Sequence, residues 1–199
     1  MATRSKQHWP SRGEPGQVRI IAGQWRGRKL HFVGAEGLRP TGDRMRETLF
    51  NWLQPSIEGS RCLDLFAGSG ALGFEAASRG AANVEMVEYN PATVRQLQSQ
   101  IARFDATNLS VTQGSALQYL QQLDQPVDLI FLDPPFHSDL LQLSLDSIDP
   151  GTMLRPNGRI YLEYPLRREP TLPAGMAFIR QKKAGDVGYG LIAVAAEKQ

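Results

Sequence analysis

The sequence has a single cysteine, Cys62, and only three histidines among 199 residues. One cysteine excludes a disulfide framework and a cysteine-rich zinc site. The scattered His8, His31 and His137 offer no metal-ligand spacing, so we expect no metal. No apolar run approaches the ~18–20 residues of a membrane-spanning helix, and the polar first residues are not those of a signal peptide. We therefore expect a soluble, cytoplasmic protein that makes no membrane contact.

No residue class is strongly over-represented, with 41% hydrophobic and 21% charged residues, which excludes disordered, collagen-like and coiled-coil proteins. The length suits one domain with a small addition. The net charge of +2 conceals an uneven distribution: residues 1–61 carry 11 Lys and Arg against 5 Asp and Glu, whereas residues 62–199 carry 11 against 15. A basic segment favours a polyanionic partner, although an ordinary solvated surface explains it equally well.

The basic segment divides into three parts. Residues 1–16 are polar, lack an apolar period and are expected to form a disordered arm. Short β-prone runs at 17–22 and 29–33 flank a Gly- and Arg-containing turn and predict a hairpin. Apolar residues recur at helical spacing over 43–53, which predicts a helix. We interpret residues 17–54 as a basic N-terminal extension, suited to a polyanionic partner, and 55–199 as the main domain.

From residue 61 onward, strands and helices alternate. Apolar runs predict strands at 62–66, 83–88, 109–113, 127–132 and 159–163, and helical patterns at 71–78, 91–104, 115–123 and 139–148 separate them. Such alternation predicts an α/β, Rossmann-like sheet that is mostly parallel, with helices on both faces. The last two runs, 177–182 and 189–195, have no helix between them and predict an antiparallel hairpin, which brings the sheet to seven strands.

In an open parallel sheet, ligands bind beyond the carboxyl ends of the strands. The end of the first strand carries Asp64 and leads into the glycine pattern Gly68-x-Gly70-x-x-Gly73. The second strand ends at Glu88, an acid suited to ribose hydroxyls. The glycines alone fit a nicotinamide dinucleotide equally well. A carboxylate at Asp64 repels a pyrophosphate, however, and favours the cationic S-adenosylmethionine.

The fourth strand of the alternating region ends in Asp133-Pro134-Pro135-Phe136. Consecutive prolines make a stiff turn that leaves carbonyl groups exposed. The Asp133 carboxylate and the Pro134 carbonyl are two acceptors that match the two hydrogens of an exocyclic amine. Phe136 can stack on an extruded base. This turn predicts methyl transfer to an sp² amine, whether on guanine, on adenine in DNA or RNA, or on a protein glutamine.

Together these motifs resemble the class I S-adenosylmethionine-dependent methyltransferases that methylate amines. The N-terminal run from Arg19 to Leu30 (RIIAGQWRGRKL) and the run from Leu38 to Leu53 (LRPTGDRMRETLFNWL) narrow the resemblance to the RsmD family of bacterial small-subunit rRNA methyltransferases. This resemblance implies methylation of a guanine N2 in 16S rRNA, free or in an assembling subunit, by a protein that we expect to be a monomer.

The resemblance also implies roles for single residues. The cofactor is expected to lie against Asp64, Phe66, Gly68, Gly70, Glu88, Tyr89, Ser115 and Ala116. Ser115 stands where many relatives carry an aspartate, so a carboxylate contact to the adenine amine is lost or is replaced by a hydroxyl contact. Phosphate contacts are expected from Arg26, Arg28, Arg39, Arg44 and Arg46. Arg44 and Arg46 lie two residues apart on a helix and cannot share one face.

Outside the methyltransferases, the alternative is a dinucleotide-binding oxidoreductase or a non-catalytic nucleotide-binding module. The glycine pattern and Glu88 fit either of these as well.

Overall fold

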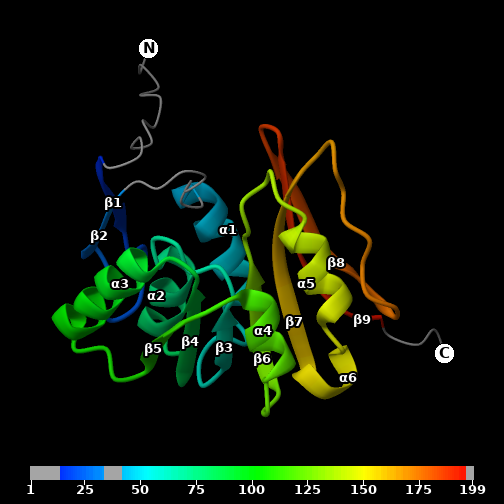
Figure 1. The fold of residues 1–199 in the computed structure, drawn as a ribbon, viewed down its shortest axis with the longest axis horizontal. Coiled ribbons are helices and arrows are strands. Elements are labelled where there is room, and N and C mark those ends of the chain that lie inside the picture. Colours follow the sequence, from blue (N-terminus) through cyan, green and yellow to red (C-terminus); the bar gives the residue numbers. More distant parts are fainter. Residues whose placement is uncertain (1–13, 34–41, 196–199) are drawn as a thin grey trace.

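A computed structural model describes residues 14–33 and 42–195 (Figure 1). The strands are β1 Pro15–Arg19, β2 Lys29–Val33, β3 Arg61–Asp64, β4 Asn83–Glu88, β5 Leu109–Gln113, β6 Val127–Leu132, β7 Leu154–Pro165, β8 Met176–Ala184 and β9 Val187–Val194. The helices are α1 Asp43–Leu53, α2 Ala71–Ser78, α3 Pro91–Phe104, α4 Ala116–Gln121, α5 Leu140–Ser147 and α6 Pro150–Met153. None of the helices in these ranges is long and apolar enough to span a bilayer.

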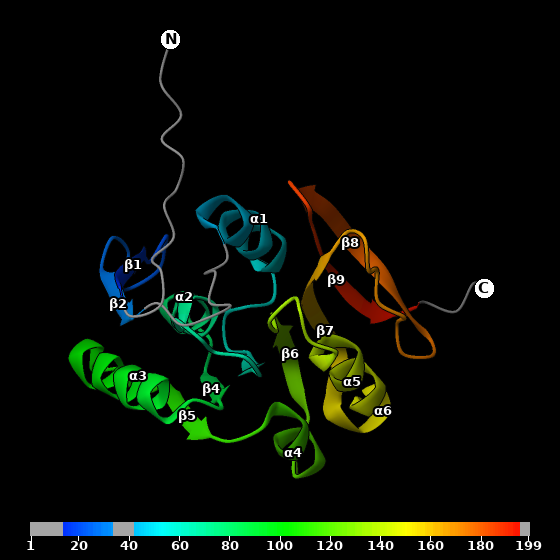
Figure 2. The same cartoon turned by 45° about the horizontal axis from the view of Figure 1, so that its top comes forward.

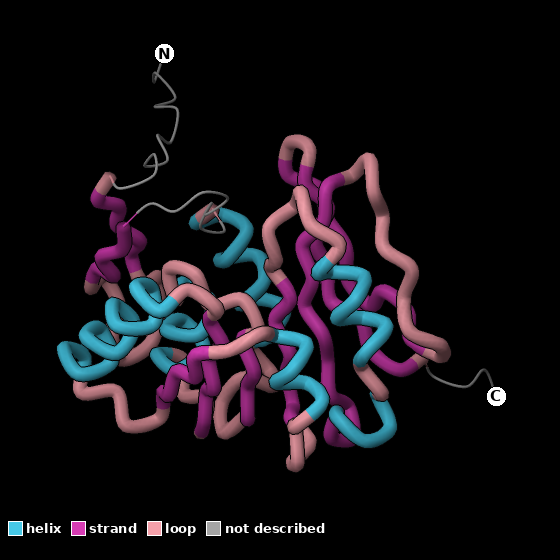
Figure 3. Tube along the Cα trace, in the orientation of Figure 1, coloured by secondary structure: helices cyan, strands magenta, loops and turns pink. Residues whose placement is uncertain are grey.

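Seven strands form one sheet in the order β5-β4-β3-β6-β7-β9-β8. The strands are drawn in magenta in Figure 3 and are labelled in the same orientation in Figure 1. The first five strands in this order pair in parallel, and β9 pairs antiparallel with both β7 and β8. The predicted mostly parallel sheet with an antiparallel C-terminal hairpin is therefore confirmed. The order reverses between β3 and β6, which is the switch point where such sheets bind ligands.

Alternating side chains divide the core into two clusters, one on each face of the sheet. On one face, Cys62 and Phe131 of the sheet pack with Phe50 of α1 and Phe74 of α2. On the other face, sheet residues such as Ile130 pack with residues of α4 and α5. In Figure 2, α1, α2 and α3 form one group of helices, and α4, α5 and α6 form a second group that is separate from the first.

The N-terminal hairpin packs onto the domain through its turn. Ile20, Trp25 and Leu30 are buried in the same cluster as Cys62 of the sheet, and the Trp25 ring makes an edge contact with Phe104 at 5.4 Å between centroids. Trp25 thus packs beneath the hairpin, which leaves no exposed face for a base. β1 begins at Pro15, two residues inside the predicted arm, and residues 1–13 lie outside the described ranges.

The turn of the hairpin lies against the last residue of α2. The Gln24 and Trp25 N–H groups donate to the carbonyl and hydroxyl oxygens of Ser78, at 2.8 and 3.0 Å. Gly23 has φ +80°, and a Cβ there would lie 1.8 Å from the Ser78 carbonyl oxygen. Only glycine permits this approach.

Two features of the C-terminal half differ from the predictions. β7 begins at Leu154 instead of 159, because Leu154 already pairs with Val127 of β6. The polar residues 155–158 form an irregularity before Arg159 pairs with Leu129. The short helix α6, not predicted, begins at Pro150 after the Asp149 carboxylate caps it.

The Glu75 carboxylate of α2 joins the N-terminal segment to the sheet domain. It accepts hydrogen bonds from the Ile21 and Ala22 N–H groups at 2.8 and 3.0 Å. It also pairs with Arg79 at 2.7 Å and with Arg46 of α1 at 3.6 Å. Glu75 and Arg46 are both completely buried.

We expect Glu75→Ala to lower the free energy of unfolding by about 3–5 kcal/mol, because buried donors and a buried arginine lose their acceptor. Urea denaturation measures this change. The matched control is Glu58→Ala, since Glu58 is exposed and its loss is expected to cost less than about 0.5 kcal/mol. Equal effects of the two substitutions would show that the buried cluster does not stabilise the fold.

Candidate active site

The glycine-rich loop connects the end of β3 to α2. Gly68 and Gly70 have φ values of 51° and 79°, and Gly70 precedes the first residue of α2. A Cβ at Gly70 would lie 2.8 Å from Leu97 and 2.9 Å from Phe74, so the tight turn needs glycine there. The Gly68 N–H donates to the Glu88 carboxylate at 3.0 Å, which draws the loop against the end of β4.

Asp64 lies beneath this loop with 1% of its surface exposed. Its Oδ2 accepts a hydrogen bond from the Gly73 N–H at 3.2 Å. Its Oδ1 is buried and has no hydrogen-bond partner among the described residues. Burial raises the pKa of Asp64 from 3.8 to about 7, and the N–H groups of Phe66 and Gly73 oppose that shift. A buried acceptor of this kind suits a cationic or N–H-donating ligand.

Glu88 and its neighbours lie at the ends of β4 and β5. The second Glu88 oxygen accepts from the Asn90 N–H at 2.8 Å, so backbone groups fix the orientation of the carboxylate. Tyr89 is 79% exposed. Ser115 precedes α4, and its side chain makes no capping hydrogen bond. The Gly114 N–H donates to the Glu88 carbonyl at 3.0 Å, which holds the two strand ends together.

The Asp133-Pro134-Pro135-Phe136 turn follows β6, next to the glycine-rich loop in the sheet order. Pro134 is buried, whereas Pro135 is exposed. The Ser138 N–H and hydroxyl both donate to the Pro135 carbonyl, at 3.0 and 2.7 Å. Proline geometry and these two hydrogen bonds make the turn rigid.

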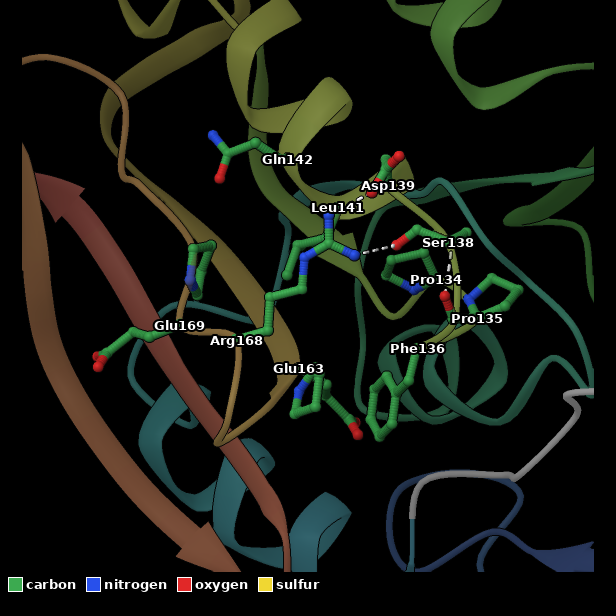
Figure 4. Close-up of a pocket in the computed structure, with 12 residues that line it drawn as sticks. Pro134, Pro135, Phe136, Ser138, Asp139, Leu141, Gln142, Glu163, Arg168 and Glu169 are labelled. Atoms are coloured by element: carbon green, nitrogen blue, oxygen red, sulfur yellow. Dashed lines mark hydrogen bonds and ion pairs between the residues drawn. The ribbon is translucent and has the colours of Figure 1, made fainter.

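Pro134, Pro135 and Phe136 line a pocket of about 100 Å³ (Figure 4). Side chains from α5, β7 and the loop after β7 complete its wall, among them Gln142, Glu163 and Arg168. Arg168 forms an ion pair with Asp139 and donates to the Ser138 carbonyl at 3.4 Å. The pocket thus lies where the predicted base-binding turn meets the end of β7.

The described arginines of the basic segment have three different environments. Arg46 is a correction to the predicted phosphate contacts, because it is completely buried and donates to Asp43 at 2.7 Å and to the Arg19 carbonyl at 3.0 Å. Arg28 is exposed, but its guanidinium lies 3.8 Å from the Phe104 ring centroid. Arg26 and Arg44 are exposed, and Arg39 lies outside the described residues.

Arg26 and Arg28 lie on the hairpin turn, at the end of α2 away from the glycine-rich loop. The turn that carries Arg26 contacts Ser78, at the end of α2 opposite Gly70. Eight helical residues span on the order of 12 Å. Arg44, the second residue of α1, is exposed whereas Arg46 is buried, so the two side chains face different sides of the helix.

Sequence reasoning missed Glu163, a buried acid that lines the pocket. Glu163 is the last residue of a predicted strand. The rule that singled out Glu88, that ligands bind at the carboxyl ends of parallel strands, therefore applies to Glu163 as well. The described residues contain no group of three or more His, Cys, Asp and Glu side chains arranged to hold a metal ion.

Comparison with known proteins gives one consistent result. Residues 18–193 match the family model described as conserved hypothetical protein 95. The chain is 45% identical to the ribosomal RNA small subunit methyltransferase D of Escherichia coli (strain K12) over 92% of each chain. It is also 45% identical to the protein of that name from Haemophilus influenzae, over 88% of this chain and 93% of the other. The solved structure of Escherichia coli yhhF superimposes with a TM-score of 0.81 at 46% identity, covering 92% of this chain and 100% of that one.

The raised pKa of Asp64 predicts a pH dependence for the ligand-free protein. Between about pH 4 and pH 7 the folded state keeps a proton that the unfolded chain releases. The free energy of unfolding therefore falls as the pH rises, by up to about 1.4 kcal/mol per pH unit from this group. Asp64→Asn cannot titrate, so we expect its stability relative to the wild type to increase from pH 5 to pH 8. Urea denaturation at each pH measures both proteins, and a constant difference would contradict the assigned pKa.

Proposed function

The chain belongs to the RsmD family, that of the ribosomal RNA small subunit methyltransferases D, and from this premise we propose that it transfers a methyl group from S-adenosylmethionine to the N2 amine of a guanine in small-subunit ribosomal RNA. The observation that carries the proposal is the rigid Asp133-Pro134-Pro135-Phe136 turn at the wall of a pocket beside the glycine-rich loop. The family relationship supports ribosomal RNA as the substrate, and the turn supports an amine as the group that accepts the methyl.

The cofactor site fits S-adenosylmethionine by the chemistry of its acceptors. The unpartnered Oδ1 of Asp64 suits the α-ammonium group, and the oriented Glu88 carboxylate suits the ribose hydroxyls. We propose that Phe66, Gly68 and Gly70 contact the methionine part and that Tyr89, Ser115 and Ala116 contact the adenosine. When bound, this cofactor supplies an electrophilic methyl group on a sulfonium sulfur.

The residues of the turn then prepare the amine. A guanine amine is a weak nucleophile because its lone pair is delocalised into the ring. Asp133 and the Pro134 carbonyl accept its two N–H hydrogens, which favours a pyramidal nitrogen whose lone pair points at the methyl group. Phe136 stacks on the base and holds it in the plane that this geometry needs. Asp133 also takes the proton that N2 releases on methylation.

RNA binding is proposed for the exposed arginines of the N-terminal segment. Arg44 lies on α1, and a substrate as large as ribosomal RNA can also reach Arg26 and Arg28 at the end of α2. Arg39 remains a prediction. The exposed large hydrophobic residues within the described ranges are spread over separate elements, which supports the proposal that the chain acts as a monomer.

Two alternatives stay distinct from this proposal. Adenine and glutamine also present an sp² amine, and the turn alone accommodates either. A nicotinamide dinucleotide fits the glycine pattern, but its pyrophosphate would approach the buried Asp64 carboxylate.

We expect Asp133→Ala to lower the rate of methyl transfer by about 10²–10³-fold or more, because the transition state loses a preorganised acceptor. Transfer of labelled methyl groups to small ribosomal subunits measures the rate. Calorimetry with S-adenosylhomocysteine should give an unchanged affinity, with no binding of NAD to either protein. Asp146→Ala, an exposed acid on α5, is the control. Full activity of Asp133→Ala would remove Asp133 from the mechanism, and binding of NAD alone would favour the oxidoreductase.

We expect RNA affinity to fall steeply as salt rises, because phosphate contacts release counterions. Arg26→Ala and Arg44→Ala should each reduce the slope of log affinity against log salt by about one. Arg155→Ala is the control, because Arg155 lies outside the basic segment and pairs with Asp128 at 3.2 Å. Filter binding with small-subunit rRNA measures the slopes. A slope that is the same in all four proteins would refute phosphate contacts by these two arginines.

A further inference from the structure

One buried carboxylate in the candidate site has no role in the methyl transfer described above. Glu163, near the end of β7, is 4% exposed, yet it lines the pocket together with Pro134 and Phe136 (Figure 4). Burial of a carboxylate is unfavourable unless polar partners compensate for the lost water. An acid that is both buried and at the wall of a pocket is suited to meet a donor on the occupant.

Strand register sets Glu163 beside Asp133. β6 and β7 pair in parallel, and their last recorded pair joins Leu132 to Leu162. The next position along both strands is Asp133 on one and Glu163 on the other, with backbones on the order of 5 Å apart. Because side chains alternate, both residues belong to the sheet face that packs against α1 and α2.

A tyrosine of the same strand orients the Glu163 carboxylate. The Tyr161 hydroxyl donates to its Oε1 at 2.7 Å. Burial, followed by the charges of Glu163 and Asp133, raises the pKa of Tyr161 well above its ordinary value, so this hydroxyl remains a donor. On the other side, Tyr189 of β9 pairs with Glu163 in the sheet and stacks on Trp52, with ring centroids 5.7 Å apart.

We infer that Glu163 accepts a hydrogen bond from the N1–H of the target guanine and thereby selects guanine over adenine. The inference rests on the proposed function and names the residue that reads the base. On guanine the N1–H lies next to the N2 amine, so two neighbouring carboxylates, Glu163 and Asp133, meet two neighbouring donor groups. Adenine presents a lone pair at N1 beside its amine, and a buried carboxylate repels that lone pair.

The test compares two bases that both carry the C2 amine. Small subunits are reconstituted with rRNA that holds either guanine or 2-aminopurine at the methylated position, and kcat/KM is measured for each. 2-Aminopurine has a lone pair at N1 in place of the hydrogen. We expect the wild-type chain to prefer guanine by about 10- to 100-fold, the discrimination of one good polar contact to a base. Glu163→Gln should reduce that preference at least about tenfold, because its amide can donate to N1.

Two controls separate base reading from a structural role. Tyr161→Phe keeps the Glu163 carboxylate but removes the hydroxyl that donates to it. The kcat/KM on guanine and on 2-aminopurine should therefore both fall, while the preference for guanine persists. S-adenosylhomocysteine affinity should be unchanged in Glu163→Gln, since this residue is not in the cofactor site. Equal losses on both bases in Glu163→Gln would overturn the inference. If the wild-type chain methylates neither base, the proposed function fails and the inference fails with it.

Discussion

The Glu75 carboxylate holds the N-terminal segment to the helix that follows the glycine-rich loop. It lies at the middle of α2, with no exposed surface, and receives two backbone N–H groups from the segment before the hairpin turn. Arg46 of α1 and Arg79 complete its surroundings. Because α2 begins directly after Gly70, the same eight-residue helix that shapes the cofactor loop also anchors the basic segment. The position of any RNA held by that segment is thereby linked to the position of the cofactor.

The uneven charge of the sequence has a structural counterpart. Acidic side chains lie at or near the carboxyl ends of four strands: Asp64 ends β3, Glu88 ends β4, Asp133 follows β6 and Glu163 lies two residues before the end of β7. Each suits a cation or an N–H or O–H donor of the proposed ligands. The exposed arginines of the N-terminal segment lie apart from these strand-end acids. The buried Arg46 pairs with Glu75, the acid that joins the N-terminal segment to the sheet domain. The net charge of +2 therefore combines a basic N-terminal segment with acids at the strand ends of the sheet domain.

Local patterns predicted most of the fold. The bounds of α1, α2, α3, β4, β5 and β6 agree with the sequence patterns, because apolar periodicity and end signals such as Pro91 act within each segment. The burial of Arg46 could not be foreseen, since its partner Glu75 lies 29 residues farther along the chain and is surrounded by apolar residues. Glu163 ended a predicted strand and could have been singled out like Glu88. Its place beside Asp133, however, comes from the β6–β7 register, which is a property of the folded sheet. The path of the hairpin turn likewise depends on Ser78 of another element.

The central claim is that the protein methylates a guanine amine in small-subunit rRNA. The residues proposed to do so are the Asp133-Pro134-Pro135-Phe136 turn, the glycine-rich loop and the strand-end acids. The most direct measurement maps modified nucleotides in that rRNA from a strain lacking the gene, and from the same strain supplied with the wild-type or the Asp133→Ala gene. The account predicts that one N2-methylguanosine disappears on deletion, returns with the wild-type gene and does not return with Asp133→Ala. An unchanged set of methylated guanines, or the loss of a methylated adenine instead, would contradict it.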